Sequence, residues 1–165
     1  MVIVLEIATV VVVAIAMALA LAHVLELPGK LRLSKEHYLA MQPIYYPGFT
    51  YAGMAEPVGL LLLLLLLFLI PAGTMNFYLI LAAFLALSAM HAAYWLLTHP
   101  VNNFWLKDFK LKGAGALFFS MGRGNKADHH RKDWTELRDR WEYSHMLRAG
   151  FGLASLILIA AAVAD

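Results

Sequence analysis

Four apolar runs of membrane-spanning length constrain this chain of 165 residues more than any other feature. They cover roughly residues 2–25, 52–71, 76–98 and 144–164. A helix needs about 20 residues to cross the hydrocarbon core of a bilayer, and each run has that length or gains it from its flanking turns. Charged residues make up only 15% of the chain, against about 25% in soluble domains. The sequence predicts a single domain over 1–165, an all-α integral membrane four-helix bundle.

The positive charges predict how the bundle is oriented in the membrane. All 13 Lys and Arg residues lie in segments 26–51 and 99–143 or at Arg148, just inside the fourth run. The turn at 71–75 carries no charge. Cationic loops stay in the cytoplasm, so we expect both polar segments to be cytoplasmic and both termini to be extracytoplasmic, in a multi-pass protein of a bacterial inner membrane. A net charge of +2 gives no reason to expect a nucleic-acid partner.

Proline, glycine and capping residues predict where the helices begin and end. Leu27-Pro28-Gly29 is expected to stop the first helix, and His99-Pro100 to end the third. Ser34 is a predicted N-cap for a short surface helix within 30–40. Aromatic residues alternate with lysines over 102–125, which predicts a cytoplasmic segment that lies on the membrane surface between helices three and four. The fourth helix is expected over 134–164, with its membrane part from about 144.

Titratable residues gather toward the predicted cytoplasmic end of all four spans. Such residues are costly inside a bilayer and commonly mark functional sites. Counting about 1.5 Å per residue from the uncharged turn places Glu56 and His91 at the same depth. The others are expected one or two turns closer to the cytoplasm, in a shared polar pocket. The full set is His23, Glu26, Glu56, His91, His99, Glu142 and His145.

The same residues leave several cofactor hypotheses open. A Glu-x-x-His pair on one helix with carboxylates from others is how di-iron bundles hold metal. Iron, copper or zinc are therefore candidate ions, haem between His91 and either His23 or His145 is an alternative, and a site without any cofactor is a third. Cysteine is absent, which excludes disulfides and thiolate ligands. The tentative metal ligands are His23, Glu26, Glu56, His91, Glu142 and His145.

One face of the fourth helix carries groups that suit an acidic aromatic molecule. Trp134, Arg138, Trp141, His145 and Arg148 recur there at helical spacing. Arginine binds carboxylate or phenolate oxygens, and histidine can remove a proton near neutral pH. We expect His145 and His91 to accept protons, Glu142 to orient, and Arg148 to hold an anion. Trp141, Asn102, His99 and Arg138 are expected to contact the substrate.

Several strings together resemble the anthrone-oxygenase-like family of small four-span membrane proteins. The strings are 23–30 (HVLELPGK), 42–46 (QPIYY), 99–102 (HPVN) and 137–148 (LRDRWEYSHMLR), together with Glu56 and Trp134. The resemblance covers essentially the whole chain. Some fungal members look like oxygenases that convert anthrones to anthraquinones without an evident cofactor, and most bacterial members have no assigned function. It implies that Pro100, Val101 and Asn102, with Trp141, His145 and Arg148, are characteristic positions.

The chain departs from the fungal oxygenases in its long basic segment 104–133, and nothing in it identifies a polyketide substrate. Two other classes of function therefore stay open. The pocket could hold a lipid or quinone without chemistry, or the bundle could be a subunit of a larger complex or a homo-oligomer. A metal- or haem-dependent redox protein is the third hypothesis.

Overall fold

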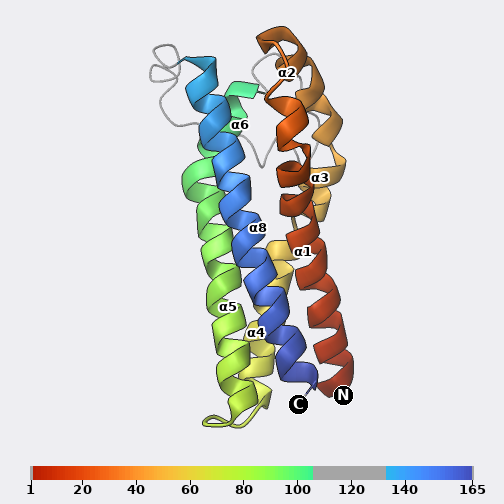
Figure 1. The fold of residues 1–165 in the computed structure, drawn as a ribbon. Helices are drawn as coiled ribbons and strands as arrows, with labels where there is room; N and C mark the ends of the chain where they lie inside the picture. Colours follow the sequence, from red (N-terminus) through yellow and green to blue (C-terminus); the bar gives the residue numbers. More distant parts are fainter. Residues whose placement is uncertain (1, 106–132, 165) are drawn as a thin grey trace.

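The computed structural model describes residues 2–105 and 133–164, and these residues form helices and turns without any strand (Figure 1). The elements, in chain order, are α1 (Val2–Lys30), α2 (Lys35–Met41), the 3₁₀ helix η1 (Gln42–Tyr45), α3 (Gly48–Ala52), α4 (Ala55–Leu69), α5 (Met75–Ala93), the π-helix η2 (Tyr94–Thr98), α6 (His99–Trp105) and α8 (Trp134–Ala164). Four helical stretches are long and apolar enough to cross a membrane: Val2–Lys30, Gly48–Leu69, Met75–Asn102 and Trp134–Ala164. The predicted all-α four-helix bundle is confirmed, and these helices support an integral membrane protein.

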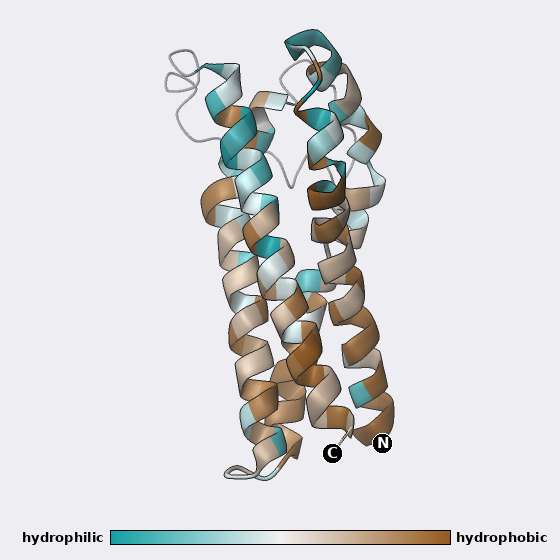
Figure 2. Cartoon of the chain, in the orientation of Figure 1, coloured by the Kyte–Doolittle hydropathy of each residue, from teal (hydrophilic) through white to brown (hydrophobic). Residues whose placement is uncertain are grey.

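The four long helices stand at the corners of the bundle. α1 packs against α4 and α8, and α5 packs against the same two helices, so α4 and α8 face each other across a diagonal. Both termini and the turn between α4 and α5 lie at one end, and α2, α3 and α6 lie toward the other (Figure 1). Hydrophilic residues concentrate at the α2 and α6 end, while the opposite end is mostly hydrophobic (Figure 2). The bundle is therefore polarised along its axis.

Two buried clusters follow that polarity. The cluster between the long helices is aliphatic, with Leu63, Leu66, Ile80, Leu87 and Ile159 fully buried. The second cluster is aromatic and joins α2, η1 and α6 to the start of α8; it comprises Tyr38, Tyr45, Val101, Trp105, Leu137 and Trp141. Helices α2, η1 and α6 thus cover the polar end of the bundle with aromatic side chains.

Helix α1 continues through Pro28 and ends at Lys30, so the prediction that Leu27-Pro28-Gly29 stops the helix is wrong. A proline removes one backbone hydrogen bond, and here the loss falls in the last turn. The Lys30 ammonium bonds back to Glu26 one turn earlier, at 3.1 Å, and to His23 one further turn away, at 3.2 Å. These contacts hold the last turn in helical form and keep Lys30 against the bundle.

The third helix also continues where the sequence predicted its end. It passes from α5 through the π-helical turn Tyr94–Thr98 into α6, which begins at His99 and includes Pro100. Because Pro100 has no N–H, the carbonyl four residues earlier, on Leu96, loses its usual helical donor. Arg140 of α8 donates to that oxygen at 2.8 Å. The chain is therefore not broken at His99-Pro100, and α6 extends over the pocket.

Other boundary predictions are confirmed. Ser34 caps α2 by accepting a hydrogen bond from the His37 backbone N–H, and the fourth helix spans Trp134–Ala164. The predicted surface-lying segment at 102–125 falls mostly outside the described residues, which end at Trp105 before resuming at Asp133.

Candidate functional site

A pocket of about 250 Å³ lies at the polar end of the bundle and reaches residues of α1, η1, α3, α4, α5, η2, α6 and α8. Aromatic side chains form much of its wall: Tyr45, Tyr46, Phe49, Tyr94, Trp105 and Trp141. Its polar groups include His23, Glu56, His91, His145 and Arg148, so four of the predicted His and Glu residues share one pocket. An apolar cavity of about 150 Å³ holds benzene, and this larger pocket has room for a flat molecule of two or three fused rings.

Glu56 is the buried hub of a polar chain that links α4, α5 and α8. Its Oε1 accepts a hydrogen bond from Arg148 Nη2, and its Oε2 lies 3.2 Å from His91 Nδ1. The Trp95 indole donates to His91 Nε2 at 3.0 Å. An indole N–H can only donate, so the His91 proton sits on Nδ1 and points to Glu56. The contact confirms that Glu56 and His91 lie at the same depth, and both nitrogens of His91 are engaged by the protein.

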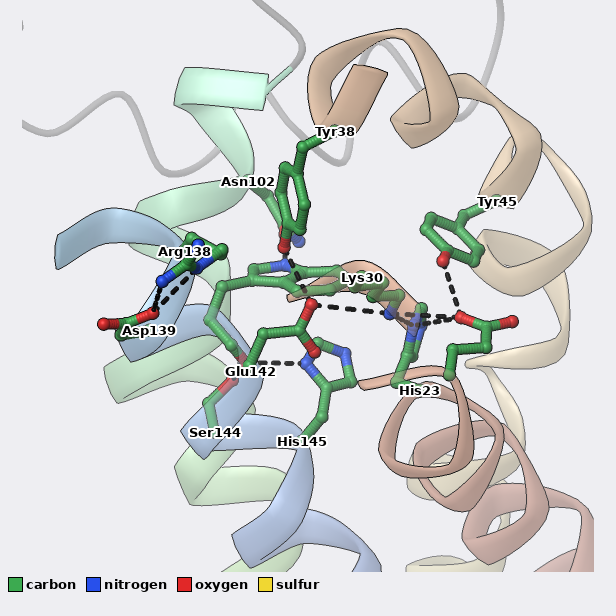
Figure 3. Close-up of polar contacts among 12 residues, drawn as sticks. His23, Lys30, Tyr38, Tyr45, Asn102, Arg138, Asp139, Glu142, Ser144 and His145 are labelled. Carbon is green, nitrogen blue, oxygen red and sulfur yellow. Dashed lines mark hydrogen bonds and ion pairs between the residues drawn. The ribbon is translucent and has the colours of Figure 1, made fainter. Parts of the chain in front are cut away.

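Lys30 forms a second polar centre, where side chains of α1, α2, η1 and α8 meet (Figure 3). Its side chain is 1% exposed, and its ammonium lies 3.1 Å from Glu26 and 3.5 Å from Glu142. It also sits over the rings of Tyr45 and Trp141, at 5.2 and 4.9 Å from their centroids. A buried cation needs paired charges to offset its desolvation, and this one has two carboxylates and two aromatic faces.

Two tyrosines donate hydrogen bonds to the carboxylates of this centre. Tyr38 donates to Glu142 at 2.8 Å, and Tyr45 donates to Glu26 at 2.6 Å (Figure 3). Burial raises the pKa of the Tyr38 phenol, and the nearby Glu142 charge raises it further. Burial also raises the pKa of Tyr45, as does its hydrogen bond to Glu26. Both phenols are therefore held in the neutral, donating form.

The imidazoles of His23 and His145 meet edge to face between α1 and α8, with ring centroids 4.1 Å apart. His145 Nδ1 lies 2.8 Å from the Trp141 carbonyl oxygen. A carbonyl only accepts, so His145 carries its proton on Nδ1 and leaves Nε2 as an acceptor. The Ser144 hydroxyl donates to the same carbonyl at 2.6 Å. His145 therefore brings an unprotonated ring nitrogen to the pocket wall.

Three donors on the pocket wall have no hydrogen-bond partner among the residues that the structure describes. They are the side-chain nitrogens Gln42 Nε2, Trp105 Nε1 and Arg148 Nε. Each belongs to a pocket-lining residue that is more than nine-tenths buried. Buried donors are nearly always paired, and each exception calls for an explanation such as a missing partner. All three would be satisfied by acceptor oxygens of a bound molecule.

The remaining predicted contact residues divide into one that lines the pocket and two that do not. Asn102 lines the pocket and accepts a hydrogen bond from Trp141 Nε1 at 2.8 Å, which fixes the indole in the wall. His99 lies beside the pocket, with Nδ1 at 3.3 Å from the Tyr94 hydroxyl. Arg138 pairs with its neighbour Asp139 at 2.7 Å and stacks over Trp134, away from the pocket.

The tentative metal site is not supported by the geometry. Across residues 2–105 and 133–164, no group of three or more His, Cys, Asp or Glu side chains is placed to hold an ion. The physical reason is that cations of the protein already occupy the carboxylates. Lys30 pairs with Glu26 and Glu142, and Arg148 pairs with Glu56. For haem, the predicted axial ligand His91 has both nitrogens in contact with Glu56 and Trp95.

Sequence reasoning missed Lys30, Gln42, Trp105 and the two tyrosines that bind carboxylates. Lys30 had a usable signal, because Glu26 and Lys30 are spaced i, i+4 on one helix face. Pro28 lies between them and predicts that the helix ends before Lys30, so the spacing alone does not predict the pair. The other residues had no comparable signal, since only the folded arrangement of η1, α2 and α6 over the bundle brings them to the site.

Comparison with models of protein families, with curated proteins and with solved structures found no match for this chain.

Proposed function

We propose that this chain is an integral membrane oxidoreductase of the anthrone-oxygenase type, and that its pocket binds a flat aromatic molecule carrying an acidic phenol or an activated C–H group. The resemblance in sequence suggests the reaction class, and the pocket supplies the physical support for it. One observation carries the proposal. A single pocket with aromatic walls contains an imidazole acceptor, His145, together with buried donors that have no hydrogen-bond partner among the described residues.

The chemistry begins with proton removal. His145 Nε2 accepts a proton from the substrate, and the resulting anion is held by donors such as Arg148 Nε. A delocalised aromatic carbanion is electron-rich enough to react with O₂. For an anthrone, the methylene carbon loses two hydrogens and gains a double bond to oxygen. One atom of O₂ becomes that carbonyl oxygen and the other leaves as water, so the reaction balances without a further reductant.

The other site residues act by positioning. Glu56 holds the Arg148 guanidinium through Nη2 and leaves Nε for the substrate. His91 holds the second oxygen of Glu56. Trp141 forms part of the wall, and its indole is anchored by Asn102. Glu142 belongs to the Lys30 centre and does not line the pocket.

The test uses the full chain purified in detergent, with anthrone as the probe and O₂ consumption and anthraquinone absorbance as readouts. We expect His145→Ala to lower kcat on the order of 10²- to 10⁴-fold, the range that a positioned general base contributes. His37→Ala is the matched control, because His37 is exposed on α2 and lies outside the pocket, and it should retain activity. Unchanged turnover in His145→Ala, or no turnover by the wild type, would overturn the proposal.

A second candidate is a lipid- or quinone-binding role without chemistry. It is favoured by the pocket mouth, where Tyr51 and Met54 are 60% and 55% exposed on the span Gly48–Leu69. A molecule dissolved in the bilayer could enter there without crossing water. Mass spectrometry of molecules extracted from the purified protein tests this role, with Arg148→Gln as the comparison. A co-purified quinone or lipid that Arg148→Gln loses, together with no anthrone turnover, would favour it over catalysis.

A further inference from the structure

Two of the three imidazoles that line the pocket, His23 and His145, have different hydrogen-bonding neighbours, and this difference divides their roles. We propose that Lys30 is a positioning residue that holds His23 with its proton on Nε2, so that the pocket contains a donor imidazole, His23, beside an acceptor imidazole, His145. The tautomer assignment stands on geometry alone, and its mechanistic consequence rests on the proposed function.

The assignment of His23 follows from the ammonium group next to it. Lys30 Nζ lies 3.2 Å from His23 Nδ1. A lysine ammonium has three donors and no acceptor, so Nδ1 must accept. The single proton of a neutral imidazole is then on Nε2. The other neutral tautomer would direct its Nδ1–H at a buried cation, and the nearby Glu26 Oε2 lies 3.7 Å from Nδ1, beyond hydrogen-bond distance.

Lys30 is held in place from several sides, so its control of His23 does not depend on one flexible contact. Glu26 and Glu142 pair with the ammonium from α1 and α8, and the Tyr45 and Trp141 rings lie against it. Both carboxylates are in turn fixed by tyrosine donors. A four-carbon side chain normally samples many rotamers, and here these contacts restrict it.

His145 is held in the opposite tautomer by the Trp141 carbonyl, which accepts from Nδ1 at 2.8 Å. The two rings contact each other at 4.1 Å between centroids, and both line the pocket. A phenol whose hydroxyl reaches both rings from the pocket gives its O–H proton to His145 Nε2, and its oxygen accepts from His23 Nε2–H. The O–H bond breaks, an N–H bond forms, and the phenolate oxygen keeps its electron pair under the His23 donor. His23 thus stabilises the charge that His145 creates.

The primary test reads the tautomers directly. The protein, labelled with ¹⁵N-histidine and held in detergent micelles, is studied by NMR at neutral pH, where protonated and unprotonated ring nitrogens resonate in separate ranges. Among the seven histidines, His23 and His145 are identified by the signals lost in His23→Gln and His145→Gln. We expect an unprotonated Nδ1 in His23 and a protonated Nδ1 in His145. Both rings in the same tautomer in the wild type would overturn the proposal.

Variants of Lys30 test its positioning role. Lys30→Met removes the donor and is expected to change the His23 pattern to a mixture of tautomers, whereas Lys30→Arg keeps a donor-only cation and should restore it. With anthrone as the probe, Lys30→Met should lower kcat on the order of 10²-fold with little change in KM, as expected when a donor to the developing anion is lost. An unchanged His23 spectrum in Lys30→Met would overturn the role of Lys30.

The outcomes separate this inference from the proposed function. Opposite tautomers without any anthrone turnover would leave the imidazole pair intact and reject the oxidoreductase. Turnover with both imidazoles in the same tautomer would retain the oxidoreductase and reject the division of roles.

Discussion

At the scale of single residues, the site is organised by two buried cations, of which the sequence indicated only one. Arg148 was recognisable because it lies on the helical face of His145. Lys30 was expected to follow the end of the first helix, because Pro28 and Gly29 normally end a helix. Tertiary contacts overrode that local signal, since the ammonium finds Glu26 on its own helix and Glu142 on α8. The i, i+4 spacing of Glu26 and Lys30 is visible in the sequence, whereas the contact of Lys30 with Glu142 depends on the fold.

The neutral phenols of Tyr38 and Tyr45 lead to a prediction about alkaline pH. Burial and the carboxylates of Glu142 and Glu26 raise the pKa of both groups above the value of about 10 for an unfolded chain. Their contribution to stability is complete below that pH and is lost as pH rises further, because only the unfolded chain then releases the protons. We expect phenolate absorbance from these two residues to appear only together with loss of helical circular dichroism.

The matched variants of this prediction are Tyr38→Phe and Tyr143→Phe. Tyr38→Phe removes a buried phenol and should make unfolding less dependent on pH above about 10. Tyr143 is 56% exposed, and Tyr143→Phe should leave that dependence as it is in the wild type. If Tyr38 ionises while the helices remain intact, the argument for a neutral donor to Glu142 fails.

At the scale of helices, the third span shows why proline is an incomplete guide to helix ends. Pro100 removes a donor, but the π-helical turn Tyr94–Thr98 precedes it, and Arg140 supplies a replacement donor to Leu96. The uninterrupted path sets Tyr94, Thr98, Asn102 and Trp105 along one pocket wall. π-Turns often occur at functional sites. The partner of Leu96 lies on α8, far away in the sequence, so no local pattern could have predicted the continuation.

Close approach of α1 and α8 depends on Gly152. A Cβ at this position would lie 3.1 Å from Met17 Cα, a backbone atom that cannot move without its helix. We predict that Gly152→Ala destabilises the bundle by about 1–3 kcal/mol, the usual cost of overpacking. Denaturant titration in detergent, followed by circular dichroism, measures this change. The same two helices carry His23 and His145, so the variant should also weaken binding in the pocket.

Gly150→Ala is the control for this prediction. Gly150 lies on the same helix two residues earlier, and a Cβ there meets nothing within 4 Å. Alanine favours a helix over glycine by up to about 1 kcal/mol, so this variant should be neutral or slightly stabilising. Equal effects of the two substitutions would show that α1 and α8 do not approach as closely as the structure has them.

At the scale of the whole molecule, the sequence predicted the features that depend on the length, composition and regular rise of whole helices. Four apolar runs, the grouping of His and Glu at one end, and the equal depth of Glu56 and His91 follow from length, composition and helical rise. The sequence did not predict which charged side chains form ion pairs. The same acids that suggested metal ligands are bound by Lys30 and Arg148, and that choice depends on helix rotation and on α2 folding back over the bundle end.

The orientation predicted from charge can be tested cleanly because the chain has no cysteine. Single variants Ala40→Cys and Ala72→Cys place one thiol at each end of the bundle, both at exposed positions. With the segments that carry Lys and Arg in the cytoplasm, a membrane-impermeant maleimide added to intact cells should label Ala72→Cys only. Labelling of both variants after the membrane is opened is the control. Selective labelling of Ala40→Cys in intact cells would reverse the topology.

The ion pair between Glu56 and Arg148 joins α4 and α8, which face each other across a diagonal of the bundle. Arg148 Nη2 donates to Glu56 and so connects the two helices, while Nε of the same guanidinium has no hydrogen-bond partner among the described residues. A ligand that accepts a hydrogen bond from Nε binds only the folded protein, so its binding free energy adds to the stability of the folded state. A ligand in the pocket should therefore raise the melting temperature, and the size of that increase reports how much of the protein has ligand bound.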